Sequence, residues 1–233
     1  MTDAHCHLRG DATRHFLCAP FAEPPPRDEE SGAVTLFFGT HPWFLDGFAA
    51  VRLRDELAEN PSAGVGEIGL DRLRDREISP KMREVFEKQL EIAAELRRPV
   101  ALHGAKCWGE VVRACRPYAG TVPAFVFHGF SRSDGLLPEI FAMNGYVSVG
   151  PAVLNDHAVN YREMVKKLPL DRLLVETDRT AENAAVTPSA YAVAAKVAEL
   201  RGIGSGELED IVDANAVRLM ASARIAAASV VLV

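Results

Sequence analysis

The chain contains 233 residues, of which 48% are hydrophobic and 25% are charged. These proportions are typical of a globular protein and exclude a disordered chain, a collagen-like chain and a coiled coil. The formal net charge is −6, from 26 Lys and Arg against 32 Asp and Glu. An acidic chain does not attract polyanions at long range, which disfavours a non-specific nucleic-acid coat. It does not disfavour an enzyme whose bound metals supply local positive charge.

The sequence shows no signal for a membrane or for export. No stretch approaches the roughly 20 apolar residues of a membrane span, and residues 1–5 carry neither a basic start nor an apolar run. We therefore expect a cytoplasmic protein with no membrane partner. The apolar tail over 226–233 packs either on the barrel described below or on a second subunit. The cysteines lack close paired spacing, so we expect reduced thiols: Cys6, Cys18, Cys107 and Cys115.

Short apolar runs with little polar alternation are typical of strands buried on both faces of a parallel sheet. The predicted strands are 2–6, 14–19, 33–38, 63–68, 99–103, 124–128, 145–149 and 172–176. Helical patterns follow at 80–97, 108–115, 136–143, 161–168 and 189–200. The first of these helices has a strong start signal, because Ser79 can cap it and Pro80 suits its first position. This alternation predicts a parallel α/β fold in one domain over residues 1–233.

Eight strands are the number that closes a TIM-type (β/α)8 barrel. The start is irregular, because a parallel connection normally needs a dozen residues or more and His7 to Arg14 leaves no room for a crossover helix. We therefore expect a barrel that is trimmed or distorted near the N-terminus. The segment 23–32 contains three consecutive prolines followed by charged residues, which predicts a stiff, exposed loop.

Polar residues stand at the carboxyl ends of five predicted strands, where a barrel places its active site. They are Asp3, His5, His7, Glu67, His103, His128 and Asp178. Imidazole nitrogens and carboxylate oxygens are ligands for divalent transition metals. One such histidine is more often a hydrogen-bonded core residue, but burying so many ionisable groups unpaired is costly. Their coincidence therefore favours a metal centre.

The spacing within the first strand has a physical reason. Residues two apart in a strand point to the same side, so His5 and His7 can bind one metal together. Asp3 shares this register and can orient a ligand histidine from behind. A carboxylate such as that of Glu67 can bridge two metals.

Several sequence blocks resemble the TatD-type deoxyribonucleases, within the amidohydrolase-like metal-dependent hydrolases, and together they run over most of the chain. They are Asp3-Ala4-His5-Cys6-His7-Leu8, Gly39-Thr40-His41-Pro42-Trp43, the run from Gly64 to Asp71, the segment 86–103, His128-Gly129-Phe130-Ser131, the segment 173–178 and Asn215-Ala216-Val217-Arg218-Leu219.

The resemblance implies a dinuclear metal site and a nuclease activity. The implied ligands are His5, His7 and Asp178 for one metal, His103 and His128 for the other, and Glu67 bridging both. A hydroxide between the metals would attack phosphorus, with Asp178 as the general base. The histidine-rich set suits zinc or manganese better than magnesium. The implied substrate is DNA, cleaved from its ends by a 3′→5′ exonuclease acting on single strands.

The loops around these ligands depart from the family pattern. Arg72 stands where the family commonly has tyrosine, Ala105 and Lys106 stand where it places an arginine, and Arg-Thr-Ala at 179–181 replaces Ala-Pro-Tyr. Ligands set the reaction class and loops set the substrate. One alternative is therefore a small-molecule amidohydrolase, lactonase or phosphoesterase using the same metals. A second alternative, a non-catalytic metal-binding protein, is disfavoured by the intact ligand set. The oligomeric state stays open.

Basic side chains near the predicted mouth suit a phosphate substrate or, equally, a solvated face. They are Arg72, Arg74, Arg76, Lys106, Arg132 and Arg179. From Arg72 to Lys106, nine basic residues outweigh six acidic ones. His41 either contacts substrate near the metals or is an ordinary turn residue before Pro42. Trp43 and Trp108 can stack on a base, although buried packing is the more usual role.

Overall fold

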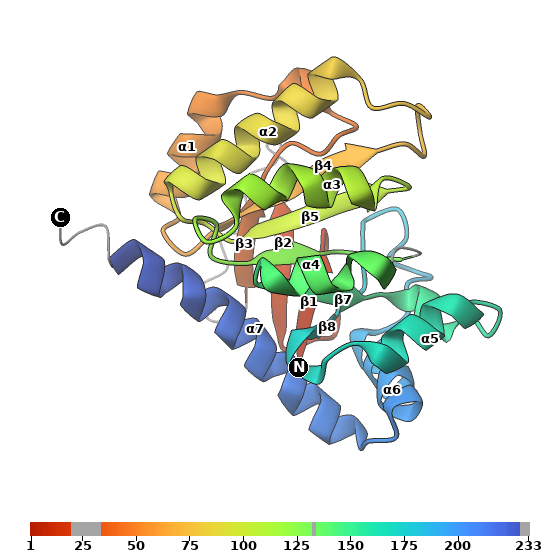
Figure 1. Cartoon of the computed structure of the whole chain (residues 1–233). Helices are drawn as coiled ribbons and strands as arrows, with labels where there is room; N and C mark the ends of the chain where they lie inside the picture. Colours follow the sequence, from red (N-terminus) through yellow and green to blue (C-terminus); the bar gives the residue numbers. More distant parts are fainter. Residues whose placement is uncertain (20–33, 132–133, 229–233) are drawn as a thin grey trace.

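A computed structural model of the chain describes residues 1–19, 34–131 and 134–228. Eight parallel strands follow one another in chain order around a nearly closed barrel (Figure 1). They are β1 (Thr2–Cys6), β2 (Arg14–Ala19), β3 (Val34–Phe38), β4 (Gly64–Asp71), β5 (Val100–Ala105), β6 (Phe125–Phe127), β7 (Gly145–Val149) and β8 (Leu173–Val175). The predicted barrel and its strands are confirmed. β4 is longer than predicted, because its pairing with β5 continues to Asp71.

Helices surround the barrel from β3 onward (Figure 1). They are α1 (Ala50–Glu59), α2 (Pro80–Glu95), α3 (Trp108–Cys115), α4 (Leu137–Ala142), α5 (Val159–Lys167), α6 (Ala190–Arg201) and α7 (Ser205–Ala228). Short 3-10 helices cover Leu45–Gly47, Arg116–Tyr118, Asp134–Leu136, Pro151–Leu154 and Leu170–Arg172. Within the described ranges, none of the helices has the length and apolar character needed to cross a membrane. The sequence predicted α2 to α6 but neither α1 nor α7.

The start of α2 follows the predicted signal. The Ser79 side chain accepts a hydrogen bond from the Met82 amide at 3.1 Å, and Pro80 occupies the first turn, where its missing N–H costs nothing. α1 has no such signal, since Ala49 precedes it without a side-chain cap and only Leu53 and Leu57 are buried. Its weak apolar pattern explains why the sequence did not predict it.

The first two strands are joined without a helix, as the short spacing predicted. β1 and β2 pair in parallel, with Thr2 opposite Arg14 and Cys6 opposite Leu17, and the register shifts between these pairs. A strand of this length rises about 13 Å, and the connection over 7–13 can extend over roughly 25 Å. An extended return is therefore long enough. The predicted stiff loop over 23–32 lies outside the described residues.

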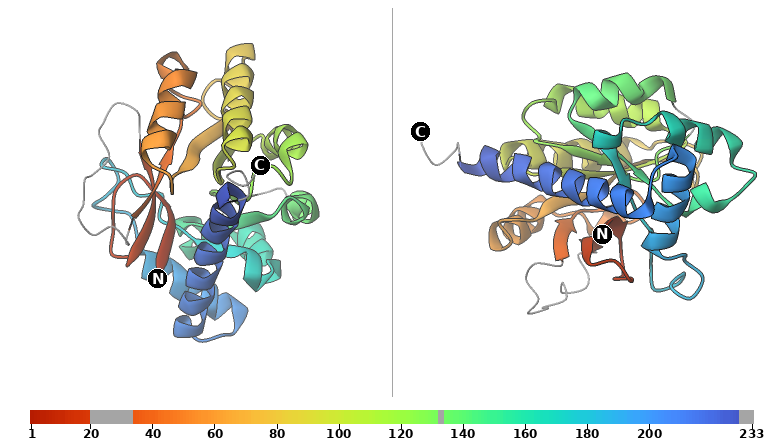
Figure 2. Two further views of the ribbon diagram at one scale, coloured as in Figure 1. Left: turned by 90° about the vertical axis from the view of Figure 1, so that its left-hand side faces the viewer. Right: turned by 90° about the horizontal axis from the view of Figure 1, so that it is seen from below.

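α7 covers the N-terminal end of the barrel. In the left view of Figure 2 this helix lies in front of the strands. Its Ala216 and Leu219 side chains join the cluster inside the barrel, which includes Phe37 and Tyr146. Asn215 of the same helix donates hydrogen bonds to the carbonyl oxygens before and at the start of β8. The opposite, C-terminal end is left for polar groups. The packing of the tail over 226–233 lies outside what the structure describes.

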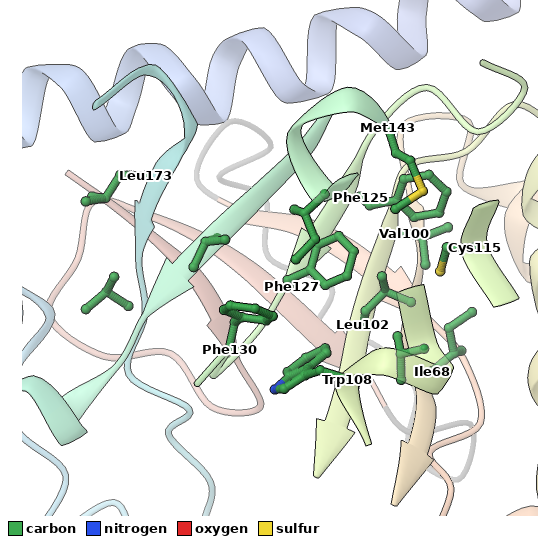
Figure 3. Close-up of a cluster of buried hydrophobic side chains, with 14 of the residues drawn as sticks. Ile68, Val100, Leu102, Trp108, Cys115, Phe125, Phe127, Phe130, Met143 and Leu173 are labelled. Carbon is green, nitrogen blue, oxygen red and sulfur yellow. The ribbon is translucent and has the colours of Figure 1, made fainter. Parts of the chain in front are cut away.

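A second apolar cluster lies between the strands and the helices (Figure 3). Trp108, only 5% exposed, packs against Phe127 and Phe130, with ring centroids 5.8 and 5.2 Å away. The expectation that Trp108 has a buried packing role is therefore confirmed.

Gly69 allows β4 and β5 to lie close together beside the site. Its φ of 156° is rare for other residues, and a Cβ there would stand 2.0 Å from the carbonyl oxygen of His103. We predict that Gly69→Ala lowers the free energy of unfolding by about 1–3 kcal/mol or more. Denaturant unfolding measures the change. Gly47→Ala is the control, because nothing lies within 4 Å of its added Cβ. Equal stability of the two variants would contradict this account.

Candidate metal centre

The predicted polar residues meet at the C-terminal mouth of the barrel. β1 supplies His5 and leads to His7, β4 supplies Glu67, β5 supplies His103, β6 leads to His128, and β8 leads to Asp178. Glu67 lies within β4 rather than at its end, so its carboxylate is at the centre of the group and its side chain is only 4% exposed. The site is therefore built around one buried carboxylate.

One oxygen of Glu67 faces the histidines of the first strand. Glu67 Oε2 lies 3.3 Å from Nε2 of His5 and 3.3 Å from Nε2 of His7. Asp178 Oδ1 lies 3.7 and 3.8 Å from the same two nitrogens. These four side chains therefore converge on one small volume between β1, β4 and the segment after β8.

The other oxygen of Glu67 faces a second group. Glu67 Oε1 lies 2.7 Å from His103 Nδ1, 3.5 Å from His128 Nε2 and 3.7 Å from His41 Nε2. His41 Nε2 also lies 3.4 Å from His103 Nδ1. The sequence left His41 as either a residue that contacts substrate or a turn residue, and the structure places its ring beside Glu67 and His103. Burial lowers the pKa of His41 to about 4, so its ring is neutral near pH 7.

The donor chemistry fits a divalent transition metal. His5 is fully buried, burial lowers its pKa, and its Nε2 makes no well-aligned hydrogen bond in the described part of the chain. A neutral, buried imidazole nitrogen without a well-aligned hydrogen bond is costly unless a ligand occupies it. Three overlapping sets bring their donor atoms within 4.8 Å of one another: His5, His7 and Glu67; His5, His128 and Asp178; His41, Glu67 and His103. Such sets of nitrogen and oxygen donors suit zinc or manganese.

Two further carboxylates hold the histidines from behind. Glu176, 1% exposed, accepts hydrogen bonds from His128 Nδ1 at 3.0 Å and from the Gly129 amide at 2.9 Å. Burial lowers the pKa of His128, but Glu176 and Glu67 outweigh it and raise that pKa to about 10. The Glu176 contact directs Nε2 of His128 toward Glu67. Glu176 lies in one of the sequence motifs, but its spacing did not indicate this role.

Asp71 does the same for His103. Its Oδ2 lies 2.9 Å from His103 Nε2 and accepts a hydrogen bond of 2.9 Å from the Trp43 indole. Burial lowers the pKa of His103, but Asp71 and Glu67 raise it to about 9. The sequence did contain a signal for this role of Asp71. Asp71 ends β4, four residues after Glu67, so the alternation of a strand places both side chains on the same side.

Asp3 acts on the backbone of the site. Its carboxylate accepts hydrogen bonds from the Thr177 amide at 3.0 Å and the Thr177 hydroxyl at 2.6 Å, and from the His5 amide at 3.4 Å. Burial raises the pKa of Asp3 to about 7. Asp178 N donates to the His5 carbonyl at 3.0 Å. These hydrogen bonds link β1 to the segment that carries Asp178. The expectation that Asp3 orients a histidine ring stays a prediction.

The basic residues of the rim differ in their surroundings. Arg72 forms an ion pair of 2.7 Å with Glu110, and Lys106 is exposed at a cavity of about 610 Å³ beside His103. Arg74 lies over the Trp43 ring at 5.7 Å. Arg132 lies outside the described residues. A second cavity of about 470 Å³ lies on the Asp178 side of the centre.

The comparisons with known proteins agree with this geometry. The model of the family described as TatD related DNase matches residues 27–221. The chain belongs to this family of metal-dependent hydrolases. YabD of Bacillus subtilis, named as an uncharacterized metal-dependent hydrolase, is 29% identical over 72% of this chain and 68% of its own. A 3′-5′ ssDNA/RNA exonuclease TatD of Cronobacter sakazakii is 30% identical over 73% and 70%.

A solved structure shows the same fold. The crystal structure of YJJV, a TatD homologue of Escherichia coli, superposes with a TM-score of 0.80 at 23% identity, covering 94% of this chain and 96% of that one. This likeness confirms the barrel. The family membership confirms the predicted enzyme class, a metal-dependent hydrolase.

Glu176 offers a test of the site. Glu176→Gln keeps the shape but removes the charge that holds His128, so we predict metal affinity about 10- to 100-fold lower. Calorimetric titration of the metal-free protein with Zn²⁺ or Mn²⁺ measures it. Glu110→Gln is the matched control, since Glu110 pairs with Arg72 at the rim. An unchanged affinity in Glu176→Gln would show that His128 is oriented without this carboxylate.

Proposed function

We propose that this TatD-family hydrolase cleaves phosphodiester bonds at the 3′ ends of single-stranded DNA, using two divalent metal ions. The observation that carries the proposal is the division of the two Glu67 oxygens between two histidine groups. Oε2 faces His5 and His7, whereas Oε1 faces His103 and His128. This division supports one metal on His5, His7 and Asp178, a second on His103 and His128, and Glu67 bridging both.

Two divalent ions at such a site would supply a nucleophile from water at neutral pH and would offset negative charge on a phosphate. Side chains of the protein would supply the proton acceptor and a contact to the substrate. Asp178, with a side chain 48% exposed, lies at the open side of the centre, where it can accept the proton of the attacking water as the general base. The neutral ring of His41 can donate a hydrogen bond to a substrate oxygen beside His103.

The substrate is proposed from the relatives and the rim. Relatives are named as ssDNA/RNA exonucleases, and exposed Arg74 and Lys106 stand near the mouth. A small-molecule hydrolase is the second candidate, because the two flanking cavities fall within the roughly 300–1,000 Å³ of small-ligand sites. We also propose, from the sequence, that residues 1–233 form a single domain and that the protein is cytoplasmic. Zinc or manganese is the proposed metal.

The first test is cleavage of end-labelled single-stranded DNA and RNA by the metal-loaded protein. We expect stepwise shortening from the 3′ end with Mn²⁺, Zn²⁺ or Mg²⁺, abolished by chelator and by Asp178→Asn. Denaturing gels with a label at either end report the direction. Absence of cleavage with two metals demonstrably bound would refute the nuclease and leave the small-molecule hydrolase.

The second test is Glu67→Gln, which keeps the size of the side chain and removes its charge. If Glu67 bridges, we expect a loss of activity of at least about 100-fold, because both metal ions lose a ligand. Metal content after gel filtration should fall at both sites. A Glu67→Gln variant that stays active with two bound metals would contradict the bridging assignment.

A further inference from the structure

Trp43 is a large aromatic side chain that remains 46% exposed at the mouth of the barrel. The buried packing expected for this residue from the sequence is therefore wrong. The next residue, Phe44, is 66% exposed, and its ring lies 6.1 Å from that of His41. Exposed apolar surface beside a reaction centre is a mark of a binding site.

The Trp43 ring is held in one orientation. Its Nε1 donates to Asp71 Oδ2 at 2.9 Å, and Asp71 is buried. The ring stands nearly perpendicular to that of His41, with centroids 4.8 Å apart and an interplanar angle of 84°, and the centroid of the His103 ring lies 6.4 Å away. The polar atom of the indole is thus satisfied inside the protein, and the exposed part of the ring is apolar. Such a ring binds a flat partner with little loss of side-chain entropy.

The surroundings indicate which partner fits. The Arg74 guanidinium lies 5.7 Å from the centre of the Trp43 ring. Because the guanidinium lies over one face of the ring, a base would stack on the other face. An aromatic ring paired with a cation in this way suits single-stranded nucleic acid, because bases stack on the ring and phosphates pair with the charge. Because Trp43 stands at the rim, outside both cavities, it suits a strand that leaves the centre better than a small, enclosed molecule.

We infer that Trp43 is a stacking platform for a nucleobase of the strand whose end lies at the metal centre, with Arg74 placed to contact a neighbouring phosphate. This inference rests on the proposed nuclease function. It assigns a subsite that selects single strands, since bases in a duplex are already stacked on their neighbours. It predicts little preference among the bases, because each has a flat face to stack.

Intrinsic fluorescence tests the platform independently of cleavage. The chain has two tryptophans, and the other, Trp108, is 5% exposed. The probe is oligothymidylate with cleavage-resistant phosphorothioate linkages, added to the metal-loaded protein. We expect this strand to quench the Trp43 emission and an abasic strand of equal length not to do so. Trp108→Phe should keep the quenching, whereas Trp43→Leu should abolish it and weaken binding roughly 5- to 150-fold.

Trp43→Phe separates stacking from the hydrogen bond to Asp71. It keeps an aromatic face and loses the indole N–H, so we expect its KM for unmodified, cleavable oligothymidylate to stay near that of the wild type, while Trp43→Leu raises it. Equal effects of both variants on kcat, with no change in KM, would show that Trp43 acts only through Asp71 and would overturn the platform. Equal affinity of Trp43→Leu and the wild type would also overturn it.

A third arm separates this inference from the proposed function. If oligothymidylate neither binds nor is cleaved while metal-dependent hydrolysis of bis(4-nitrophenyl) phosphate persists, the nuclease proposal is refuted, and the platform with it. If the strand is cleaved but does not quench Trp43, only the platform is refuted.

Discussion

The buried carboxylate of Glu67 is the group on which the arrangement of the mouth depends. In the described part of the chain, nitrogens of five histidines lie 2.7–3.7 Å from its two oxygens. Burial alone raises the pKa of this carboxyl, but His5 and His128 hold it well below its usual range. A buried anion must be compensated by nearby positive charge. The histidines around Glu67, and the cations they are suited to hold, supply that compensation.

The histidines are in turn fixed from outside by further carboxylates. Asp71 contacts His103 and Glu176 contacts His128, so each imidazole lies between two acidic groups. If these imidazoles were neutral, nothing among them would offset the negative charge of the carboxylates. Protons on His103 and His128 are one remedy, as their raised pKa values show. Bound metal ions would be the other, because binding a metal displaces those protons.

The sequence predicted the strands and the residues at their ends better than the groups behind them. Strands buried on both faces leave a clear apolar signal, and histidines that follow them stand out. α7 was missed because Leu208 and Val212 recur at helical spacing among many small and polar residues. The roles of Asp71 and Glu176 depend on which ring nitrogen faces inward, and spacing along the chain does not specify this. Spacing also does not specify that Asp71 accepts a hydrogen bond from the indole of Trp43, whose ring remains exposed.

The placement of residues on strands or in loops separates the groups that set the reaction class from those that set the substrate. The inner residues stand on or directly after strands, whose positions the barrel fixes, so substitutions in the loops leave the metal-binding chemistry in place. Asp71 connects the two levels, because one oxygen, Oδ2, contacts both His103 and the loop residue Trp43. A nucleic-acid strand that stacks on Trp43 would therefore bind next to a carboxylate that also contacts His103. Under the proposed function, substrate binding at the rim would therefore be linked to the orientation of His103 through the buried carboxylate of Asp71.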